Sequence, residues 1–230
     1  MNGQGGVCMG KFMNRWKSLV FLAALLILLG CSGPVRPNVT LPANLFSRHL
    51  LVMPFYAVRS KGSIVTCPYC GKNNPAGPIG PDAESTLTDM LIVGLQRRGY
   101  QVIPMRDVEA EILKIGEKKV RSYPLAAAKE LASRFKAKLV VAGVVFEYRA
   151  RKGSDFGVAK PAAVSFSLHL IDGKTGHILW KDSYHEVQEA LSEDVTNIGR
   201  FLKRKGKWVT ARRLAYDGMN TLLDNFPEPE

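Results

Sequence analysis

The sequence lacks the motifs that mark most nucleotide-binding proteins and hydrolases. Its 230 residues contain no GxxxxGKS/T phosphate-binding loop, no GxGxxG dinucleotide fingerprint and no Ser-His-Asp signature. Histidine is also scarce, and the 4 histidines are spread along the chain at His49, His169, His177 and His185. His177 and His185 share a predicted strand but lie about 25 Å apart at roughly 3.3 Å per residue, too far for one metal ion. We therefore expect surface or half-buried histidines, no catalytic residue and no cofactor.

No apolar run in the chain is long enough to span a membrane. The run from Leu19 to Leu29 is unbroken, but a transmembrane helix needs about 20 residues. Basic residues precede this run at Lys11, Arg15 and Lys17. This layout is typical of a secretory signal peptide, and it predicts that residues 1–30 are cleaved.

The last residues of this leader resemble the lipobox of bacterial lipoproteins: Leu28, Leu29, Gly30 and Cys31 match it at each position. The resemblance implies that the Cys31 thiol receives fatty acyl chains such as palmitate. Each buried CH₂ of such a chain contributes about 0.8 kcal/mol, so several chains form a firm anchor. An ordinary signal peptide is the alternative. Ser32 follows the cysteine where enterobacterial inner-membrane lipoproteins have Asp, which favours the periplasmic face of the outer membrane.

Acidic residues are few compared with basic ones. The leader holds three of the 32 Lys and Arg residues and none of the 20 Asp and Glu residues, so the mature chain keeps 29 basic residues and a formal charge of +9. This charge favours anionic headgroups or glycan as partners, since an exported chain rarely meets nucleic acid. One basic cluster comprises Lys203, Arg204, Lys205, Lys207, Arg212 and Arg213. Most such clusters are solvated helix faces, and contact with an anionic surface is the alternative.

Two of the 4 cysteines stand in Cys67-Pro68-Tyr69-Cys70, the active-site motif of glutaredoxins. In such enzymes a helix begins at the motif and lowers the pKa of the first thiol, whereas here the Gly- and Pro-rich residues 71–78 follow. A disulfide in an oxidising compartment is favoured. Two alternatives stay open: a zinc knuckle completed by a partner or a histidine, because no second cysteine pair supplies the other ligands, and a catalytic thiol pair.

Hydrophobic periodicity predicts one α/β or α+β domain over residues 49–226. We expect residues 31–48 to be the lipidated Cys31 and a Pro-containing tether, and residues 227–230 to form a disordered tail. The expected order is β-α-β-α-α-β-β-β-α, with helices packed on a mixed sheet and a terminal antiparallel hairpin. These elements are expected at 49–58, 82–98, 100–104, 106–115, 122–135, 139–150, 164–170, 178–184 and 211–226.

Four segments in order resemble a known periplasmic domain. They are Leu51–Phe55, Gly99–Pro104, Ala137–Val145 and Ile171–Trp180. The domain is shared by the curli-secretion lipoprotein, the penicillin-binding-protein activator lipoprotein and the N-terminal domain of TolB. The resemblance implies a lipid-anchored α/β domain that works by contact with other envelope components.

These observations favour a non-catalytic outer-membrane lipoprotein that binds an envelope protein or peptidoglycan, in envelope assembly, secretion or peptidoglycan synthesis. The exposed sheet edge and the loop around Cys67 are the expected binding surfaces. A periplasmic thiol-disulfide oxidoreductase, with Cys67 as nucleophile and Cys70 as resolving thiol, is the enzymatic alternative. The third hypothesis is a ring-forming structural subunit of a secretion complex. A homo-oligomer also stays open as the assembly state.

Overall fold

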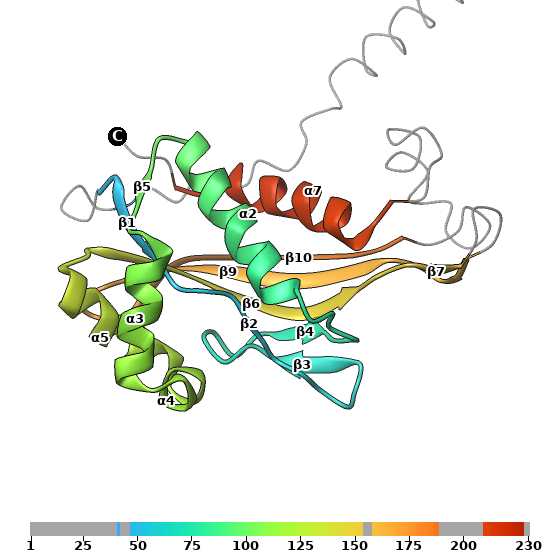
Figure 1. Cartoon of the computed structure of the whole chain (residues 1–230), viewed down its shortest axis with the longest axis horizontal. Helices are drawn as coiled ribbons and strands as arrows, with labels where there is room; N and C mark the ends of the chain where they lie inside the picture. Colours follow the sequence, from blue (N-terminus) through green and yellow to red (C-terminus); the bar gives the residue numbers. More distant parts are fainter. Residues whose placement is uncertain (1–40, 42–46, 154–157, 189–208, 228–230) are drawn as a thin grey trace, which may run out of the picture. The chain divides into compact units, whose positions relative to one another are not determined.

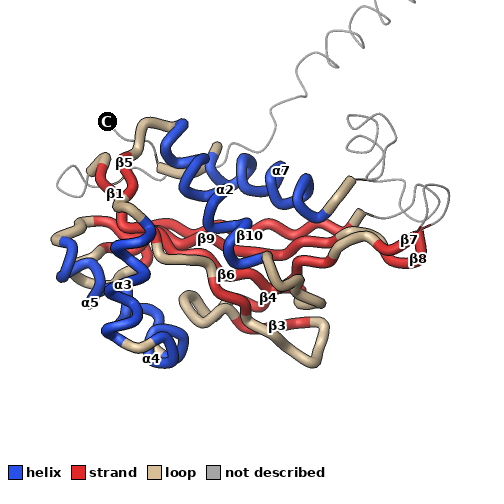
Figure 2. The backbone as a smooth tube through the Cα atoms, viewed as in Figure 1, coloured by secondary structure: helices blue, strands red, loops and turns tan. Residues whose placement is uncertain are grey.

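A six-stranded mixed sheet forms the centre of the computed structural model, which describes residues 41, 47–153, 158–188 and 209–227 (Figures 1 and 2). Along the sheet the strands run β10-β9-β6-β1-β5, and β2 pairs with β6 beyond the end of β1. β1 is parallel to β5 and β6, whereas β9 is antiparallel to β6 and β10. The strands of this sheet are β1 (His49–Val52), β2 (Tyr56–Ala57), β5 (Gln101–Val102), β6 (Leu139–Arg149), β9 (Ala163–Asp172) and β10 (Ile178–Val187).

Helices cover both faces of the sheet. They are α2 (Ala83–Arg97), α3 (Met105–Ile115), α4 (Glu117–Ser122), α5 (Pro124–Phe135) and α7 (Ala211–Leu223). Two small antiparallel ladders complete the described part: β3 (Ile64–Thr66) with β4 (Asn73–Pro75), and β7 (Lys152–Gly153) with β8 (Val158–Lys160). No helix in the described ranges is both long and apolar enough to cross a membrane.

The predicted fold class is confirmed, because the predicted strands and helices occur in the predicted order. Three features were missed. The β3–β4 ladder lies in a Gly- and Pro-rich stretch that was interpreted as a loop, and β7–β8 lies in the polar loop after β6. α4 is a six-residue helix with one buried residue, Val120, so it has no apolar stripe to reveal it.

β6 is the central strand because its side chains are apolar without alternation. Ten of its 11 residues are buried, so it has a core on each face. On one face, α2 and α7 pack over residues such as Leu139, Val141 and Val145. On the other face, α3, α4 and α5 pack over residues such as Val140 and Ala142. In Figure 1 the β3–β4 ladder lies on this second face too, beside the helices.

The segment expected as one strand over 49–58 is interrupted at Pro54. Val52 pairs with Val141, and Met53 still donates its N–H to the Val141 carbonyl at 2.8 Å. Pairing then resumes at Tyr56, opposite Val144, with one extra residue on the β1–β2 side. Proline has no N–H to donate, so it is tolerated at such a bulge.

The ends of α2 agree with the prediction in position but not in every contact. Asp82 is the N-cap residue, yet its side chain makes no capping hydrogen bond; its carbonyl accepts from the Thr86 N–H instead. Gly99 follows the helix with φ of 84°, which is the left-handed conformation expected of a glycine that ends a helix.

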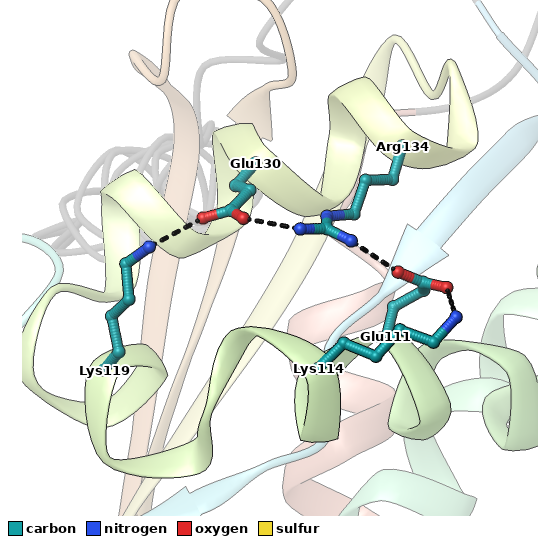
Figure 3. Close-up of polar contacts among 5 residues, drawn as sticks. All are labelled: Glu111, Lys114, Lys119, Glu130 and Arg134. Carbon is teal, nitrogen blue, oxygen red and sulfur yellow. Dashed lines mark hydrogen bonds and ion pairs between the residues drawn. The ribbon is translucent and has the colours of Figure 1, made fainter.

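A line of ion pairs joins the three helices on the second face (Figure 3). Arg134 of α5 lies 2.8 Å from Glu111 of α3 and 2.8 Å from Glu130, and Glu130 lies 3.1 Å from Lys119 of α4. Lys114 completes the line at 2.6 Å from Glu111. These hydrogen bonds lower the pKa of Glu111 and Glu130. Because the pairs are exposed to solvent, we expect them to orient the helices more than to stabilise the fold.

Gly143 tests the packing of the central strand. A Cβ added there would overlap the Phe55 ring, which packs edge-on against Phe166. We expect Gly143→Ala to lower the free energy of unfolding by about 1–3 kcal/mol, the usual cost of overpacking a core. Urea unfolding measures this. Gly62→Ala is the control, because a Cβ there would lie 3.7 Å from its nearest neighbour, Ser60 Oγ. Equal losses in the two variants would contradict this description of the core.

Candidate functional site

The chain leaves β6 and returns to it at neighbouring residues. Val58 donates its N–H to the Val145 carbonyl at 3.0 Å, and Gly77 donates to the Phe146 carbonyl at 3.0 Å. Residues 59–76 therefore form a closed excursion, which we call the cysteine loop. β6 also carries a bulge here, since its register with β9 shifts between Val145 and Glu147.

The cysteine loop is a short hairpin closed by a tight turn. Cys67 donates its N–H to the Lys72 carbonyl at 2.8 Å, and Gly71 donates to the Cys67 carbonyl at 2.9 Å. Gly71 has φ of 71°, a conformation that glycine adopts at little cost. Residues 68–70 form a turn, and no helix begins at Cys67. The turn thus lacks the helix N-terminus that activates the first thiol of a thiol-disulfide oxidoreductase.

The floor under this hairpin is the polar face of β9. Ser165, Ser167 and His169 point to this face and are at most 3% exposed. Apolar and polar residues alternate from Val164 to Leu170, a pattern that predicts one buried and one solvated face. That prediction is wrong for β9. The hairpin covers the second face, so all ten residues of β9 are buried.

The hairpin brings both cysteines to His169. One ligand atom from each of Cys67, Cys70 and His169 lies within 4.8 Å of the other two. Cys67 Sγ is 3.4 Å from His169 Nε2 and 3.9 Å from Ser167 Oγ. Cys67 and His169 are buried, and Cys70 is half-buried. The sequence favoured surface or half-buried histidines and no metal site. The first expectation is wrong for His169, which is fully buried.

Cys67 and Cys70 are free thiols in the structure. The disulfide that the sequence favours stays a prediction. The turn places both sulfur atoms near one imidazole from a segment about 100 residues away.

Tyr69, inside the cysteine motif, fixes the hairpin to the sheet. Its side chain is buried, and its ring lies 5.0 Å from the His169 ring at an interplanar angle of 30°. It also packs 6.0 Å from the Tyr56 ring, and its hydroxyl reaches Met53 Sδ at 4.0 Å. At the rim, Lys72 Nζ donates to Ser183 Oγ of β10 at 2.9 Å. The hairpin is thus attached to β1–β2, β9 and β10.

Burial sets the protonation states in this cluster. It lowers the pKa of His169 to about 4, with a smaller opposing effect from the Ala142 backbone, so the imidazole is neutral at pH 7. Burial also raises the pKa of the Cys67 thiol, although the backbone groups of Cys70 and Tyr69 act in the other direction. His169 Nδ1 is buried, and within the described residues no group makes a well-formed hydrogen bond to it.

The other predicted site residues are not brought into this cluster. His49, His177 and His185 are exposed, as expected of surface histidines. Arg212 and Arg213 lie exposed in the first turn of α7. The remaining basic residues of the predicted cluster (Lys203, Arg204, Lys205 and Lys207) lie outside the described residues, as does the lipobox with Cys31.

Comparison with known proteins gives distant structural likenesses only. No family model matches the chain, and no curated protein matches it. Among solved structures it is similar to the PelC dodecamer from Paraburkholderia phytofirmans, with 14% identity, 84% of this chain and 96% of that chain covered, and a TM-score of 0.45.

Two further likenesses are to the lipoprotein GNA1162 from Neisseria meningitidis and the LpoB C-terminal domain from Salmonella enterica. GNA1162 is 18% identical over 70% of this chain and 94% of that chain, with a TM-score of 0.44. LpoB is 16% identical over 61% of this chain and 82% of that chain, with a TM-score of 0.37. Bacterial lipoproteins are thus among the structures that this chain is similar to, but at this distance no activity or partner is transferred. The resemblance to the curli-secretion lipoprotein and TolB stays a prediction.

The neutral, buried His169 predicts a pH dependence of stability. An unfolded histidine binds a proton below its ordinary pKa of 6.5, whereas folded His169 does so only near 4. Lowering the pH through this window therefore favours the unfolded state, by up to about 3 kcal/mol at roughly 1.4 kcal/mol per pKa unit.

Urea unfolding between pH 7.5 and 4.5, with chelator and reductant present, measures this dependence. His169→Gln should flatten the curve between pH 6.5 and 4.5, and His177→Gln, at an exposed histidine, should leave it unchanged. Parallel curves for the unsubstituted protein and His169→Gln would show that His169 is not held neutral.

Proposed function

We propose that this protein is a non-catalytic lipoprotein at the periplasmic face of the outer membrane, and that its domain binds an envelope partner in envelope assembly, secretion or peptidoglycan synthesis. The observation that carries the proposal is the Leu28-Leu29-Gly30-Cys31 box, which directly follows the basic and apolar parts of a signal peptide. Lipid on Cys31 would then fix the chain to a bilayer.

The distance between Cys31 and the sheet limits where the domain can act. The first strand begins at His49, so residues 32–48 connect it to the lipidated cysteine. Even fully extended, a segment of this length spans at most about 60 Å. The domain would therefore meet partners that lie at the membrane surface or close to it.

The cysteine cluster favours a binding role over the thiol-disulfide oxidoreductase. A catalytic thiol must be accessible and have a lowered pKa, so that the thiolate can attack. Cys67 is 1% exposed, and burial raises the pKa of its thiol. The motif therefore has the spacing of a redox enzyme without the environment that makes its first thiol reactive.

The exposed side chains of β10 are the docking surface we propose. β10 is a ten-residue strand that pairs with β9. The exposed Lys181 and His185 lie along this strand and can provide specificity.

Lipidation is tested by labelling and fractionation. Labelled palmitate should enter the mature protein, and Cys31→Ala should abolish labelling and release the protein from the membrane fraction or leave an uncleaved precursor. Cys8→Ala is the matched control and should change neither result. Unlabelled mature protein, or a mature Cys31→Ala form that stays equally membrane-bound, would refute the proposal.

A basic groove between α2 and α7 supports contact with an anionic surface. It measures about 440 Å³, and its lining includes Arg97, Arg212, Arg213 and Tyr216. One acidic residue, Asp89, also lines the groove, and Arg213 pairs with Asp217 at 3.0 Å. Arg212 and Arg213 come from the basic cluster that the sequence singled out.

Sedimentation with anionic vesicles tests this contact in the chain that begins at Ser32. Each basic side chain near such a surface contributes about 1 kcal/mol, so Arg212→Gln with Arg213→Gln should lower the partition coefficient by about tenfold or more at low salt. Arg106→Gln with Lys118→Gln removes the same charge from exposed residues of α3 and α4 and should have a smaller effect. Equal binding by both double variants would exclude the groove as a membrane contact.

A further inference from the structure

We propose that Cys67, Cys70 and His169 bind a zinc ion, which fastens the cysteine loop to the central sheet. This inference goes beyond the proposed function, because it concerns residues that need neither the lipid nor the partner. The observation behind it is the meeting of one buried imidazole nitrogen and two thiols, with all three ligand atoms within 4.8 Å of one another.

The donor set selects zinc. Two thiolate sulfurs and one imidazole nitrogen are soft to borderline ligands, which favour zinc over magnesium or calcium. A zinc ion bound by two thiolates also has no net charge, so a largely buried site can hold it without an uncompensated charge. Both thiols give their protons to solvent when the metal binds.

The histidine presents one ring nitrogen to the thiols. Its side chain is buried, and Nε2 lies 3.4 Å from Cys67 Sγ. The Tyr69 ring, stacked 5.0 Å away, limits how far the imidazole can rotate.

The hairpin geometry fits a metal-binding turn. The Cys67–Gly71 turn places the two cysteines three residues apart with a left-handed glycine immediately after them. This spacing matches one half of a structural zinc site, and His169 supplies a third ligand. A fourth position of a tetrahedral ion is left for solvent or for a group of a bound partner.

A bound metal would also stabilise a part of the fold that has few other contacts, the β3–β4 hairpin. The hairpin has two three-residue strands, and hairpins of this size are not stable alone. It lies against Ser167 and His169, and few of its side chains, Val65, Cys67 and Tyr69 among them, contribute apolar contacts with the core. Metal–ligand bonds between residues about 100 positions apart would close this long loop directly.

Metal analysis tests the proposal in the full chain carrying Cys8→Ser and Cys31→Ser, purified in detergent and reductant. In this background Cys67 and Cys70 are the remaining thiols, and lipidation cannot affect the result. We expect about one zinc per chain, and a melting temperature that falls on chelation and recovers with zinc but not with magnesium. Cobalt in place of zinc should give the charge-transfer absorption of a thiolate-bound ion.

Variants identify the ligands. Cys70→Ser, at the half-buried cysteine, should remove part of the cobalt–thiolate absorption, and Cys70→Ser and His169→Gln should each weaken zinc binding at least about 100-fold. His177→Gln, at an exposed histidine, should bind zinc as the background protein does. The chelation and zinc-recovery experiment needs no substitution, so a variant that fails to fold does not leave the proposal untested.

Two results would overturn the zinc site. One is that the protein, once reduced, binds no zinc. This holds whether its cysteines were isolated as free thiols or as a Cys67–Cys70 disulfide. The other is equal zinc affinity in Cys70→Ser, His169→Gln and His177→Gln. Either result would leave the lipid anchor and the β10 docking surface unaffected, because those depend on other residues.

Discussion

The described structure depends on the pairing of β6 along both of its edges. On one edge β6 pairs with β9; on the other it pairs first with β1, then with β2 and finally with the segment after the cysteine loop. Because Val58 and Gly77 bond to neighbouring carbonyls of β6, the cysteine loop must start and end at one point of the sheet. The antiparallel register of β6 with β9 then places His169 opposite Ala142, beneath that loop. One strand thus brings together the residues of the candidate metal centre.

The two faces of β9 are stabilised by different means. Phe166, Leu168 and Leu170 contribute to the apolar core with α2 and α7, where burial of hydrocarbon is sufficient. The opposite face has hydroxyls and an imidazole, whose burial is costly unless they find polar partners. The hairpin provides Tyr69 and the two thiols there, and Lys72 bonds to β10. The cysteine loop is therefore attached to both β9 and β10.

The fold was predictable because its long elements have clear periodicity, whereas the site depends on contacts that periodicity does not contain. The continuous apolar run from Leu139 and the stripe from Ala211 identified β6 and α7 from sequence. The Cys67–Cys70 pair was visible too, but its third partner stands about 100 residues away and is defined by strand register. Alternation around His169 indicated a solvated face, since nothing in the sequence shows that a Gly- and Pro-rich loop folds back to cover it.

Hydrogen–deuterium exchange of the cysteine loop tests most directly whether the cluster of Cys67, Cys70 and His169 holds the hairpin on the sheet. The amides of Cys67 and Gly71 donate to carbonyls within the turn, and those of β6 serve as the internal reference. With zinc bound, we expect the loop amides to be protected from exchange. Chelation should speed their exchange about tenfold or more, while the amides of β6 keep their protection. Loop amides that exchange at one rate with and without zinc would contradict it.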